Sequence, residues 1–440
     1  MPSLPRVIET SARWAYGGLL WLLTPFYLLR LWRRGQAEPL YRVAMGERFG
    51  FYQRPAAHAA YVWVHAVSLG ETRAAAALIS ALRVQLPGLR LLLTHSTATG
   101  REAGAALLHA GDAQTWLPFD TPGAVRRFFR HWQPAIGVLM ETEIWPNLLF
   151  GAERAAVKMV LANARLSARS QRRGERFSAL LYPAARRLSL VLAQTEGDAE
   201  RLRASAAPHV RVAGNLKYDM AVDAALLARG RQWHQLLNRP VLLLAVSREG
   251  EEAMLLEAWC KLPLEGRPLL LIVPRHPQRF DEVAALITDA GLTLARRSGW
   301  QDLPPAEALS ADAWLGDSMR EMPLYYAMAQ VALLGGSFAP LGGQNLIEAA
   351  ACACPVVMGA HTFNFAEAAA LALDAGAALR VADMAQGMAT GLSLCADPAG
   401  RAQMADAAQR FSAQHRGAAQ RMALAIVGIV PRPLSAPQFP

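Results

Sequence analysis

The feature that most constrains this chain is an alternation of short apolar runs with helical stretches, which occurs in two blocks. This alternation is typical of parallel sheets whose strands are connected and covered by helices. Between the blocks, residues 221–240 show no strand pattern, which indicates a linker. We therefore predict an α/β fold with two doubly wound domains in sequence. The expected strands lie at residues 61–67, 89–94, 135–140, 158–162, 188–193 and 210–213 in the first block, and at 241–246, 269–273, 313–316, 331–334 and 355–358 in the second.

Composition narrows the class of protein. Of the 440 residues, 53% are hydrophobic, which excludes a disordered chain, and only 18% are charged, which indicates deep burial or membrane contact. The net charge of +10 favours an acidic partner, whether nucleic acid, anionic lipid or a phosphorylated substrate. The four cysteines show no metal-ligand spacing, which argues against structural zinc and fits a reducing compartment.

The N-terminal segment has the pattern of a membrane anchor. Residues 14–29 carry no charge and are flanked by Arg13 and Arg30. Sixteen residues give a helix of roughly 24 Å, shorter than a hydrocarbon core of ~30 Å, and Pro25 is expected to kink it. We expect membrane association, with spanning left open, and the excess of arginines after the segment predicts that the remaining chain is cytoplasmic. A buried core helix is the alternative.

Polar residues in the first block collect directly after predicted strands. The carboxyl ends of parallel strands meet at one edge of a sheet, where ligands bind, so these residues are expected to converge. Glu71 has a second interpretation, because Ser68 and Glu71 form the spacing of a helix capping box. Glu141 and Glu143 are not an obvious acid/base pair, and one of them is expected to be structural. The set comprises Glu71, Ser96, Thr97, Glu141, Glu143, Asn163 and Lys217.

A glycine-rich stretch at residues 333–359 stands out in the second block. It reads strand, Gly335-Gly336-Ser337, Gly342-Gly343, then a helix that begins after Asn345 and carries Glu348, then a strand. The paired glycines would let a phosphate approach bare backbone amides, although neither GxGxxG nor GxxxxGK[ST] is present. A glycine turn between two core elements is the alternative. Arg275 follows another strand, where it could clamp a phosphate or form a surface ion pair.

Arginines are dense in two further segments, and two interpretations stay open for them. Such runs are usually solvated helix faces, but next to a membrane anchor they could hold lipid headgroups or the phosphates of an acceptor. They comprise Arg126, Arg127 and Arg130, and then Arg165, Arg169, Arg172, Arg173 and Arg176.

A series of short motifs resembles the 3-deoxy-D-manno-oct-2-ulosonic acid (Kdo) transferases of Gram-negative lipopolysaccharide assembly. Each motif is weak alone, but nine in the same order are specific, and the similarity spans roughly residues 36–400. Three positions depart from the family pattern: Gln344 and Arg248 replace histidines, and Arg320 replaces a glycine. The motifs are VWVHAVSLGE, HSTATG, METEIWPNLL, NARLSARS, GNLKYD, VPRHPQRF, GDSMREM, GGSFAPLGGQNLIEAA and FNF.

The resemblance implies a GT-B glycosyltransferase, with two Rossmann-like domains facing a cleft and an N-terminal membrane-anchor helix. It implies an anchor at residues 1–35, an acceptor-binding domain at 36–226, a donor-binding domain at 227–430 and a tail at 431–440. The implied reaction is an inverting transfer of Kdo from CMP-Kdo to a lipid A precursor (lipid IVA), on the cytoplasmic side of the bacterial inner membrane. Inner-membrane lipids are expected as further partners. No metal, other cofactor or nucleic acid is expected.

The resemblance also implies roles for particular residues. Glu71 matches the family's general base. Donor-side positions contacting CMP match Arg275, Gly336, Ser337, Asn345 and Glu348, and the expected acceptor-side residues are Ser96, Thr97, Glu141 and Lys217. Two rivals stay open: a GT-B enzyme that uses another nucleotide sugar, and a membrane-anchored binding scaffold without chemistry.

Overall fold

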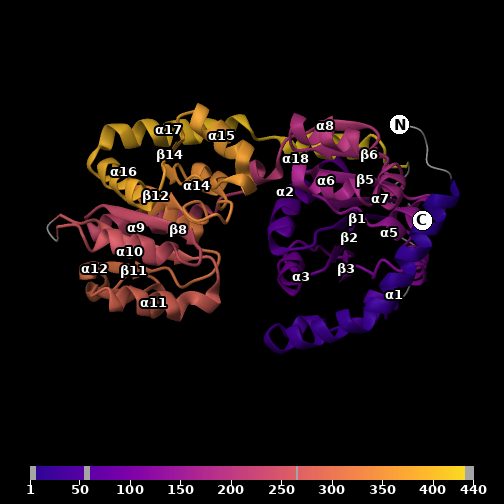
Figure 1. Cartoon of the computed structure of the whole chain (residues 1–440), viewed down its shortest axis with the longest axis horizontal. Coiled ribbons are helices and arrows are strands. Elements are labelled where there is room, and N and C mark those ends of the chain that lie inside the picture. The colour runs from indigo at the N-terminus through magenta and orange to yellow at the C-terminus, as the bar shows by residue number, and fades with distance from the viewer. Residues whose placement is uncertain (1–5, 54–59, 264–265, 432–440) are drawn as a thin grey trace, which may run out of the picture. The chain divides into compact units, whose positions relative to one another are not determined.

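The computed structural model describes residues 6–53, 60–263 and 266–431, and it divides into two compact units (Figure 1). Unit 1 ends its main stretch at Met220 and resumes at Arg416, whereas unit 2 is Ala221–His415. The first division therefore lies at the N-terminal end of the predicted linker, and the linker itself belongs to unit 2. The division differs from the expected boundaries at the C-terminal end, because the chain after His415 belongs to unit 1 and not to unit 2. The expected tail lies outside the described residues from 432 onward.

Unit 1 is built on a parallel seven-stranded sheet of order β3-β2-β1-β4-β5-β6-β7. Its first six strands have the order of dinucleotide-binding Rossmann folds, in which the chain starts in the middle and winds outward in both directions. The strands are β1 (Tyr61–His65), β2 (Arg90–His95), β3 (Ala113–Trp116), β4 (Ile136–Met140), β5 (Lys158–Ala164), β6 (Leu190–Ala193) and β7 (Val210–Val212).

Helices cover both faces of this sheet, as the near-continuous apolar strands require. One face packs against α2 and the C-terminal helix α18, with Leu78 and Met422 in the shared core. The opposite face packs against α4 and α5 through Phe128 and Leu149. The helices of unit 1 are α1 (Arg6–Ala37), α2 (Leu69–Gln85), α3 (Ala98–Ala105), α4 (Pro122–Trp132), α5 (Pro146–Arg154), α6 (Ala168–Glu175), α7 (Ser178–Ala185), α8 (Glu196–Ala204) and α18 (Ala418–Val427).

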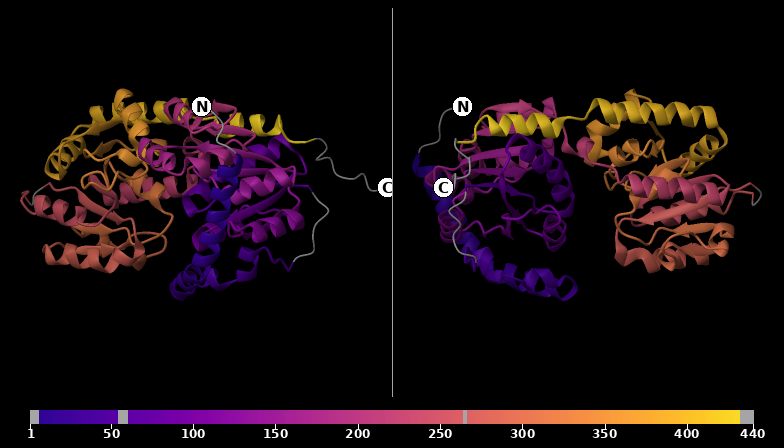
Figure 2. Two further views of the ribbon diagram at one scale, coloured as in Figure 1. Left: turned by 45° about the vertical axis from the view of Figure 1, so that its right-hand side comes forward. Right: turned by 180° about the vertical axis from the view of Figure 1, so that it is seen from behind.

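Unit 2 repeats the architecture, and Figure 2 shows its ribbon from two further directions. Its parallel sheet has the order β10-β11-β9-β8-β12-β13-β14. Its strands are β8 (Val241–Ser247), β9 (Leu269–Pro274), β10 (Leu294–Arg296), β11 (Ala313–Leu315), β12 (Val331–Leu334), β13 (Val356–Met358) and β14 (Ala378–Arg380). Its helices are α9 (Ala224–Leu237), α10 (Glu251–Trp259), α11 (Phe280–Asp289), α12 (Ala306–Ser310), α13 (Met322–Met328), α14 (Leu346–Ala351), α15 (Ala366–Asp374), α16 (Met384–Ala396) and α17 (Pro398–Gln414).

The predicted α/β fold with two doubly wound sheets is confirmed, and every predicted strand is present. The three strands that the sequence pattern missed are β3, β10 and β14, all of which lie at a sheet edge. An edge strand pairs with only one neighbouring strand and is often short, so its run of apolar residues is hard to recognise in the sequence. In β10, for example, all three residues are only half-buried.

The N-terminal segment forms one helix, α1, that continues through Pro25 and docks on unit 1. The Tyr16 hydroxyl donates to the Asp120 carboxylate at 3.0 Å, and the Arg13 guanidinium lies 4.3 Å from the centre of the Phe150 ring. In the part of the chain that the structure describes, no helix is both long and apolar enough to cross a bilayer. The outer side of α1 nevertheless leaves large apolar residues exposed: Val7, Ile8, Trp14, Leu19, Trp21, Leu22, Leu23, Phe26, Tyr27, Leu29 and Trp32.

Candidate active site

Glu71 lies at the topological switch point of unit 1. The strand order reverses between β1 and β4, and in open α/β sheets ligands bind outside the carboxyl ends of the strands at this point. Glu71 is in the first turn of α2, four residues beyond Val67 at the end of the β1 connection, and Glu141 and Glu143 directly follow β4. The strand-end rule therefore placed these carboxylates correctly at one edge of the sheet.

The Glu71 carboxylate is held at both oxygens. The amide of Val67 donates to Oε2 at 2.8 Å, and the Ser68 hydroxyl donates to Oε1 at 3.2 Å. Ser68 is also the N-cap of α2, so the capping arrangement suggested by the sequence is present. Capping and chemistry are compatible, because the two interactions fix the carboxylate while leaving it half-buried at the sheet edge.

The proton affinity of Glu71 is unusual for a helix cap. Burial, together with the negative charges of Glu141 and Glu143, raises its pKa to about 7 against the lowering effect of its hydrogen bonds to Val67 and Ser68. Burial lowers the pKa of Lys217, whereas Glu141 and Glu71 oppose that shift. Glu71, Glu141 and Lys217 are therefore close enough to influence one another electrostatically, as a convergent site requires.

A layer of buried polar residues lies behind Glu143. His65 ends β1 and is fully buried; its Nδ1 lies 2.9 Å from the Thr94 hydroxyl and its Nε2 lies 3.9 Å from Glu143 Oε2. Burial lowers the pKa of His65 to about 3, so the ring is neutral at pH 7. Glu143 also accepts a 2.6 Å hydrogen bond from the Trp145 indole, which identifies it as the more structurally engaged of the two carboxylates. His65 was not predicted, although it stands six residues before Glu71 in the HAVSLGE motif.

The remaining predicted residues of unit 1 hold the strand ends together. The Thr97 hydroxyl caps α3 and donates to the Val67 carbonyl at 2.9 Å, and the Ser96 amide donates to the same carbonyl. The Asn163 side chain accepts from the amide of Leu216 at 3.0 Å, next to Lys217. The side chains of Thr97 and Asn163 are therefore bonded to backbone groups at the strand ends, and they position the site through these bonds.

The switch point of unit 2 lies between β8 and β12, and a buried glutamate fills it. Glu251, the first residue of α10, has no exposed surface. Its two oxygens accept from four backbone amides: Gly336 at 2.7 Å, Arg248 at 2.9 Å, Phe338 at 3.1 Å and Ala339 at 3.4 Å.

Glu251 changes the interpretation of the glycine-rich stretch. The sequence predicted bare amides around Gly336, ready for a phosphate, but the Gly336 amide is already bound to a carboxylate within the chain. Ser337 is equally engaged, because its buried hydroxyl donates to the Leu334 carbonyl at 2.5 Å and accepts from the Gly359 amide at 2.8 Å. In this structure Gly336 and Ser337 shape the loop, and the Gly336 amide and the Ser337 hydroxyl are engaged within the chain.

The other three predicted donor-side residues differ in their exposure. Asn345 caps α14 by accepting from the Ile347 amide at 3.2 Å, and Glu348 lies one turn into that helix, half-buried. Arg275 follows β9 and is exposed. Gln344 borders Gly336, since a Cβ added to that glycine would lie 3.1 Å from the Gln344 amide nitrogen.

Arg320, where the resembling family has glycine, has a φ of 69°. Glycine adopts this left-handed conformation readily, whereas an arginine is strained in it. Arg320 therefore adopts the left-handed backbone conformation that suits a glycine at this position. Among the described residues there is also no group of three or more His, Cys, Asp or Glu side chains that could hold a metal ion.

Comparison with known proteins gives a consistent result. Residues 44–220 match the sequence family described as 3-deoxy-D-manno-octulosonic-acid transferase (kdotransferase). The chain is 48% identical to the 3-deoxy-D-manno-octulosonic acid transferase of Bordetella pertussis, over 91% of this chain and 95% of that protein. It is 33% identical to the protein of the same name from Haemophilus influenzae, over 93% of this chain and 97% of that protein.

Solved structures with the same fold are more distant in sequence. Anabaena Alr3699/HepE in complex with UDP matches 84% of this chain and 99% of its own, with a TM-score of 0.57 and 13% identity. A UDP-N-acetylglucosamine 2-epimerase matches 86% of this chain and 99% of its own, with a TM-score of 0.57 and 13% identity. These likenesses concern the fold alone, which is that of GT-B glycosyltransferases. The sequence relationships, by contrast, cover almost the whole chain, and on them the chain belongs to the 3-deoxy-D-manno-octulosonic acid (Kdo) transferase family.

Proposed function

We propose that this chain transfers Kdo from CMP-Kdo to a lipid A precursor in lipopolysaccharide core assembly, with Glu71 as the general base. The observation that carries the proposal is the Glu71 carboxylate, which is fixed at the switch point of unit 1 with a pKa raised to about 7. A general base is most effective when its pKa lies near the working pH. An ordinary helix-capping glutamate needs no such shift.

The reaction requires three changes of bonding. A hydroxyl oxygen of the acceptor sugar attacks the anomeric carbon of Kdo, the bond from that carbon to the CMP phosphate breaks, and the hydroxyl proton passes to the base. Glu71 takes this proton in its carboxylate form, and the Val67 amide and Ser68 hydroxyl keep the carboxylate oriented. Glu141 and Lys217 lie in the same electrostatic neighbourhood, where they would contact the acceptor.

Unit 2 is proposed to bind the donor. Arg275, Asn345 and Glu348 are the predicted contacts with CMP, and an arginine guanidinium can bind a phosphate with two parallel hydrogen bonds. The roles of Gly336 and Ser337 are proposed to be indirect. Because Glu251 ties the Gly336 amide and neighbouring amides to α10, it holds the loop before α14 in one conformation.

Unit 1 is proposed to lie on the cytoplasmic surface of the inner membrane through α1. The exposed fraction is 69% for Trp14, Leu22 and Phe26, whereas large apolar side chains are normally buried in a soluble domain. A helix with such a face lies in the membrane interface without crossing it. The triple variant Trp14→Gln, Leu22→Gln, Phe26→Gln should release the protein from membranes. Its activity on detergent-solubilised acceptor should stay close to wild type.

The function is tested by mass spectrometry of a tetraacylated lipid A precursor incubated with CMP-Kdo and the protein. The expected product is the acceptor with added Kdo, together with free CMP, and Glu71→Gln serves as the matched negative control. Product formation with a UDP-sugar but not CMP-Kdo would identify a different GT-B enzyme. If the protein binds CMP-Kdo but forms no product under any condition, it is a binding scaffold and not an enzyme.

A further inference from the structure

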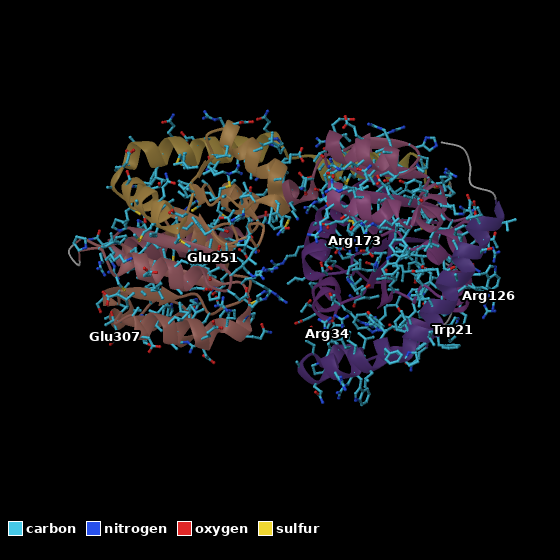
Figure 3. All side chains as sticks on the ribbon, in the orientation of Figure 1. Trp21, Arg34, Arg126, Arg173, Glu251 and Glu307 are labelled. Atoms are coloured by element: carbon cyan, nitrogen blue, oxygen red, sulfur yellow. The ribbon has the colours of Figure 1, made fainter. Side chains whose placement is uncertain are left out.

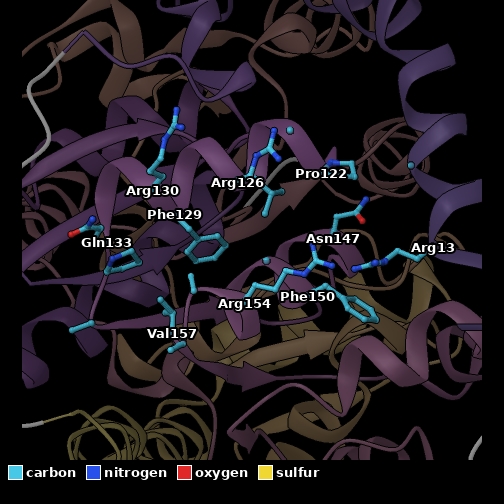
Figure 4. Close-up of a pocket in the computed structure, with 18 of the residues that line it drawn as sticks. Arg13, Pro122, Arg126, Phe129, Arg130, Gln133, Asn147, Phe150, Arg154 and Val157 are labelled. Atoms are coloured by element: carbon cyan, nitrogen blue, oxygen red, sulfur yellow. The ribbon is translucent and has the colours of Figure 1, made fainter. Parts of the chain in front are cut away.

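A large cavity in unit 1 belongs neither to the switch point nor to the donor side. Its volume is about 1120 Å³, and it lies where α1 crosses α4 and α5 (Figure 4). Four arginines from these three helices line it: Arg13, Arg126, Arg130 and Arg154. Among the described residues that line the cavity, none is acidic.

The charges of these arginines are only partly compensated, since the charge of Glu153 favours the ionised form of Arg13, whose guanidinium also lies over the Phe150 ring. Arg187, which stacks on Phe150 from nearby, is paired with Glu153 at 2.7 Å. Within the described ranges, in contrast, no carboxylate forms an ion pair with any of the four cavity arginines. Figure 4 shows Arg13 and Arg154 reaching toward each other from α1 and α5, with Asn147 beside them. Burial and the nearby charges of Arg154 and Arg187 lower the pKa of Arg13, whereas the charge of Glu153 opposes that shift.

Positive charges that converge on one cavity repel one another, and an anion bound between them relieves that repulsion. Guanidinium groups bind phosphate in a bidentate geometry, and the Asn147 amide offers a further polar contact. A solvated helix face, the usual explanation for a run of arginines, would spread the charges over open surface. Here Arg126, Arg130 and Arg154 are also exposed, but together with Arg13 they come from three separate helices and line a single cavity.

The cavity is continuous with the exposed apolar side of α1. Trp14 and Trp21 line the cavity and are themselves 69% and 57% exposed, and Figure 3 shows Trp21 and Arg126 on the outer side of unit 1 near α1. Tryptophan is enriched at the level of lipid headgroups, where one end of its ring is apolar and the other is wet. A ligand that is anionic at one end and apolar at the other fits the arginines of the cavity with one end and the apolar side of α1 with the other.

We propose that the cavity between α1, α4 and α5 binds the phosphate headgroup of an anionic membrane phospholipid, with its acyl chains along the exposed side of α1. The site would give unit 1 a preference for anionic bilayers beyond general electrostatic attraction. The proposal rests on the proposed membrane association of α1, but it does not depend on Kdo transfer.

The test measures binding of the protein to vesicles of phosphatidylcholine alone and to vesicles that also contain 30% phosphatidylglycerol, at one salt concentration. The ratio reported is the association constant for the vesicles with phosphatidylglycerol divided by that for phosphatidylcholine alone. The variant Arg126→Gln, Arg130→Gln, Arg154→Gln removes three charges from the cavity. The matched control, Arg169→Gln, Arg172→Gln, Arg173→Gln, removes three exposed charges from α6 in the same unit. We expect the ratio to fall about tenfold or more in the cavity variant and by less than about threefold in the control.

A second variant blocks the cavity without changing charge. Gly18 lines the cavity, and a Cβ added there would meet nothing within 4 Å, so Gly18→Phe should fold normally and fill the space. It should raise binding to phosphatidylcholine and still lower the ratio. Equal losses in the cavity and control triples would overturn the proposal, because they indicate diffuse attraction.

Two further outcomes would also overturn the proposal. Wild-type protein that binds neither vesicle contradicts the membrane association itself. Inorganic phosphate that raises the melting temperature of the wild type but not of the cavity variant, without a vesicle preference, identifies a site for free phosphate. Kdo transfer to detergent-solubilised acceptor is measured on the same preparations, so a failure of the proposed function is seen separately.

Discussion

Each unit carries a glutamate in the first turn of the helix that follows the first strand of its sheet: Glu71 on α2 after β1, and Glu251 on α10 after β8. Both lie at a switch point, and burial raises the pKa of both. They differ in their partners. Glu251 accepts from four backbone amides and is fully buried, whereas Glu71 accepts from one amide and one hydroxyl and stays half-buried.

The difference separates structure from chemistry at equivalent positions. A carboxylate that accepts from four amides and has no exposed surface has its lone pairs engaged within the chain, so it organises a loop and is not accessible to an acceptor hydroxyl. A carboxylate with fewer partners and two negative neighbours keeps a pKa near 7 and can exchange protons. Substitution of the two glutamates should therefore affect different properties.

The largest effect is expected for Glu71→Gln. Glutamine keeps the volume and the cap of α2 but cannot accept a proton from the acceptor hydroxyl, so turnover should fall by roughly 10²–10⁴-fold. The loss of stability should stay at or below about 1 kcal/mol, the usual cost of a weakened cap. Steady-state kinetics and thermal melts on one preparation measure both. A folded Glu71→Gln protein with full activity would reduce Glu71 to a helix cap.

Glu251→Gln should reverse this pattern. Replacing the carboxylate removes a charged acceptor from the amides of Gly336 and Phe338, so the free energy of unfolding should fall by about 2–3 kcal/mol. Calorimetric melting measures the loss, and Glu249→Gln is the control, because its half-exposed side chain should change stability by no more than about 0.5 kcal/mol. Equal stability of the two variants would show that Glu251 does not hold the loop.

The donor contacts should show a smaller effect on binding alone. Arg275→Ala and Glu348→Ala are each expected to weaken CMP binding by about 1.5–3 kcal/mol if a charged hydrogen bond is lost. Arg410→Ala and Glu307→Ala, both on exposed parts of unit 2, are the controls. Calorimetric titration with wild-type affinity in both test variants would remove these residues from the donor site.

Much of this fold was predictable because its signals are local. Buried parallel strands give continuous apolar runs, and the polar residues after them mark the edge where the site forms; this is how Glu71, Glu141 and Lys217 were found together. Docking of α18 on α2 was not predictable, since it depends on contacts between segments far apart in the sequence. The edge strands β3, β10 and β14 were missed because they are short and weakly apolar.

The least predictable feature was the role of Glu251. Its partner amide, that of Gly336, lies 85 residues along the chain, and nothing near Glu251 in the sequence indicates the pairing. The glycines at 335 and 336 were interpreted as a phosphate site because paired glycines can expose amides to a phosphate or bring them to a carboxylate of the same chain. His65 was missed for a similar reason: its buried contact with Thr94 depends on the pairing of β1 with β2.

The central claim, that Glu71 is the proton acceptor, is tested most directly by the pH dependence of kcat/KM in the wild type and in Glu141→Gln. Glu71 must be ionised to act as a base, so kcat/KM should rise with pH, reach a plateau above about pH 7 and fall tenfold per pH unit well below it. Glu141→Gln removes a negative neighbour, stabilises the Glu71 carboxylate and should move the midpoint to lower pH. Because both proteins act on the same substrates, a shift between them reports on the protein. A midpoint that is the same in both, or one near the ordinary glutamate pKa of about 4.3 in the wild type, would contradict the assignment.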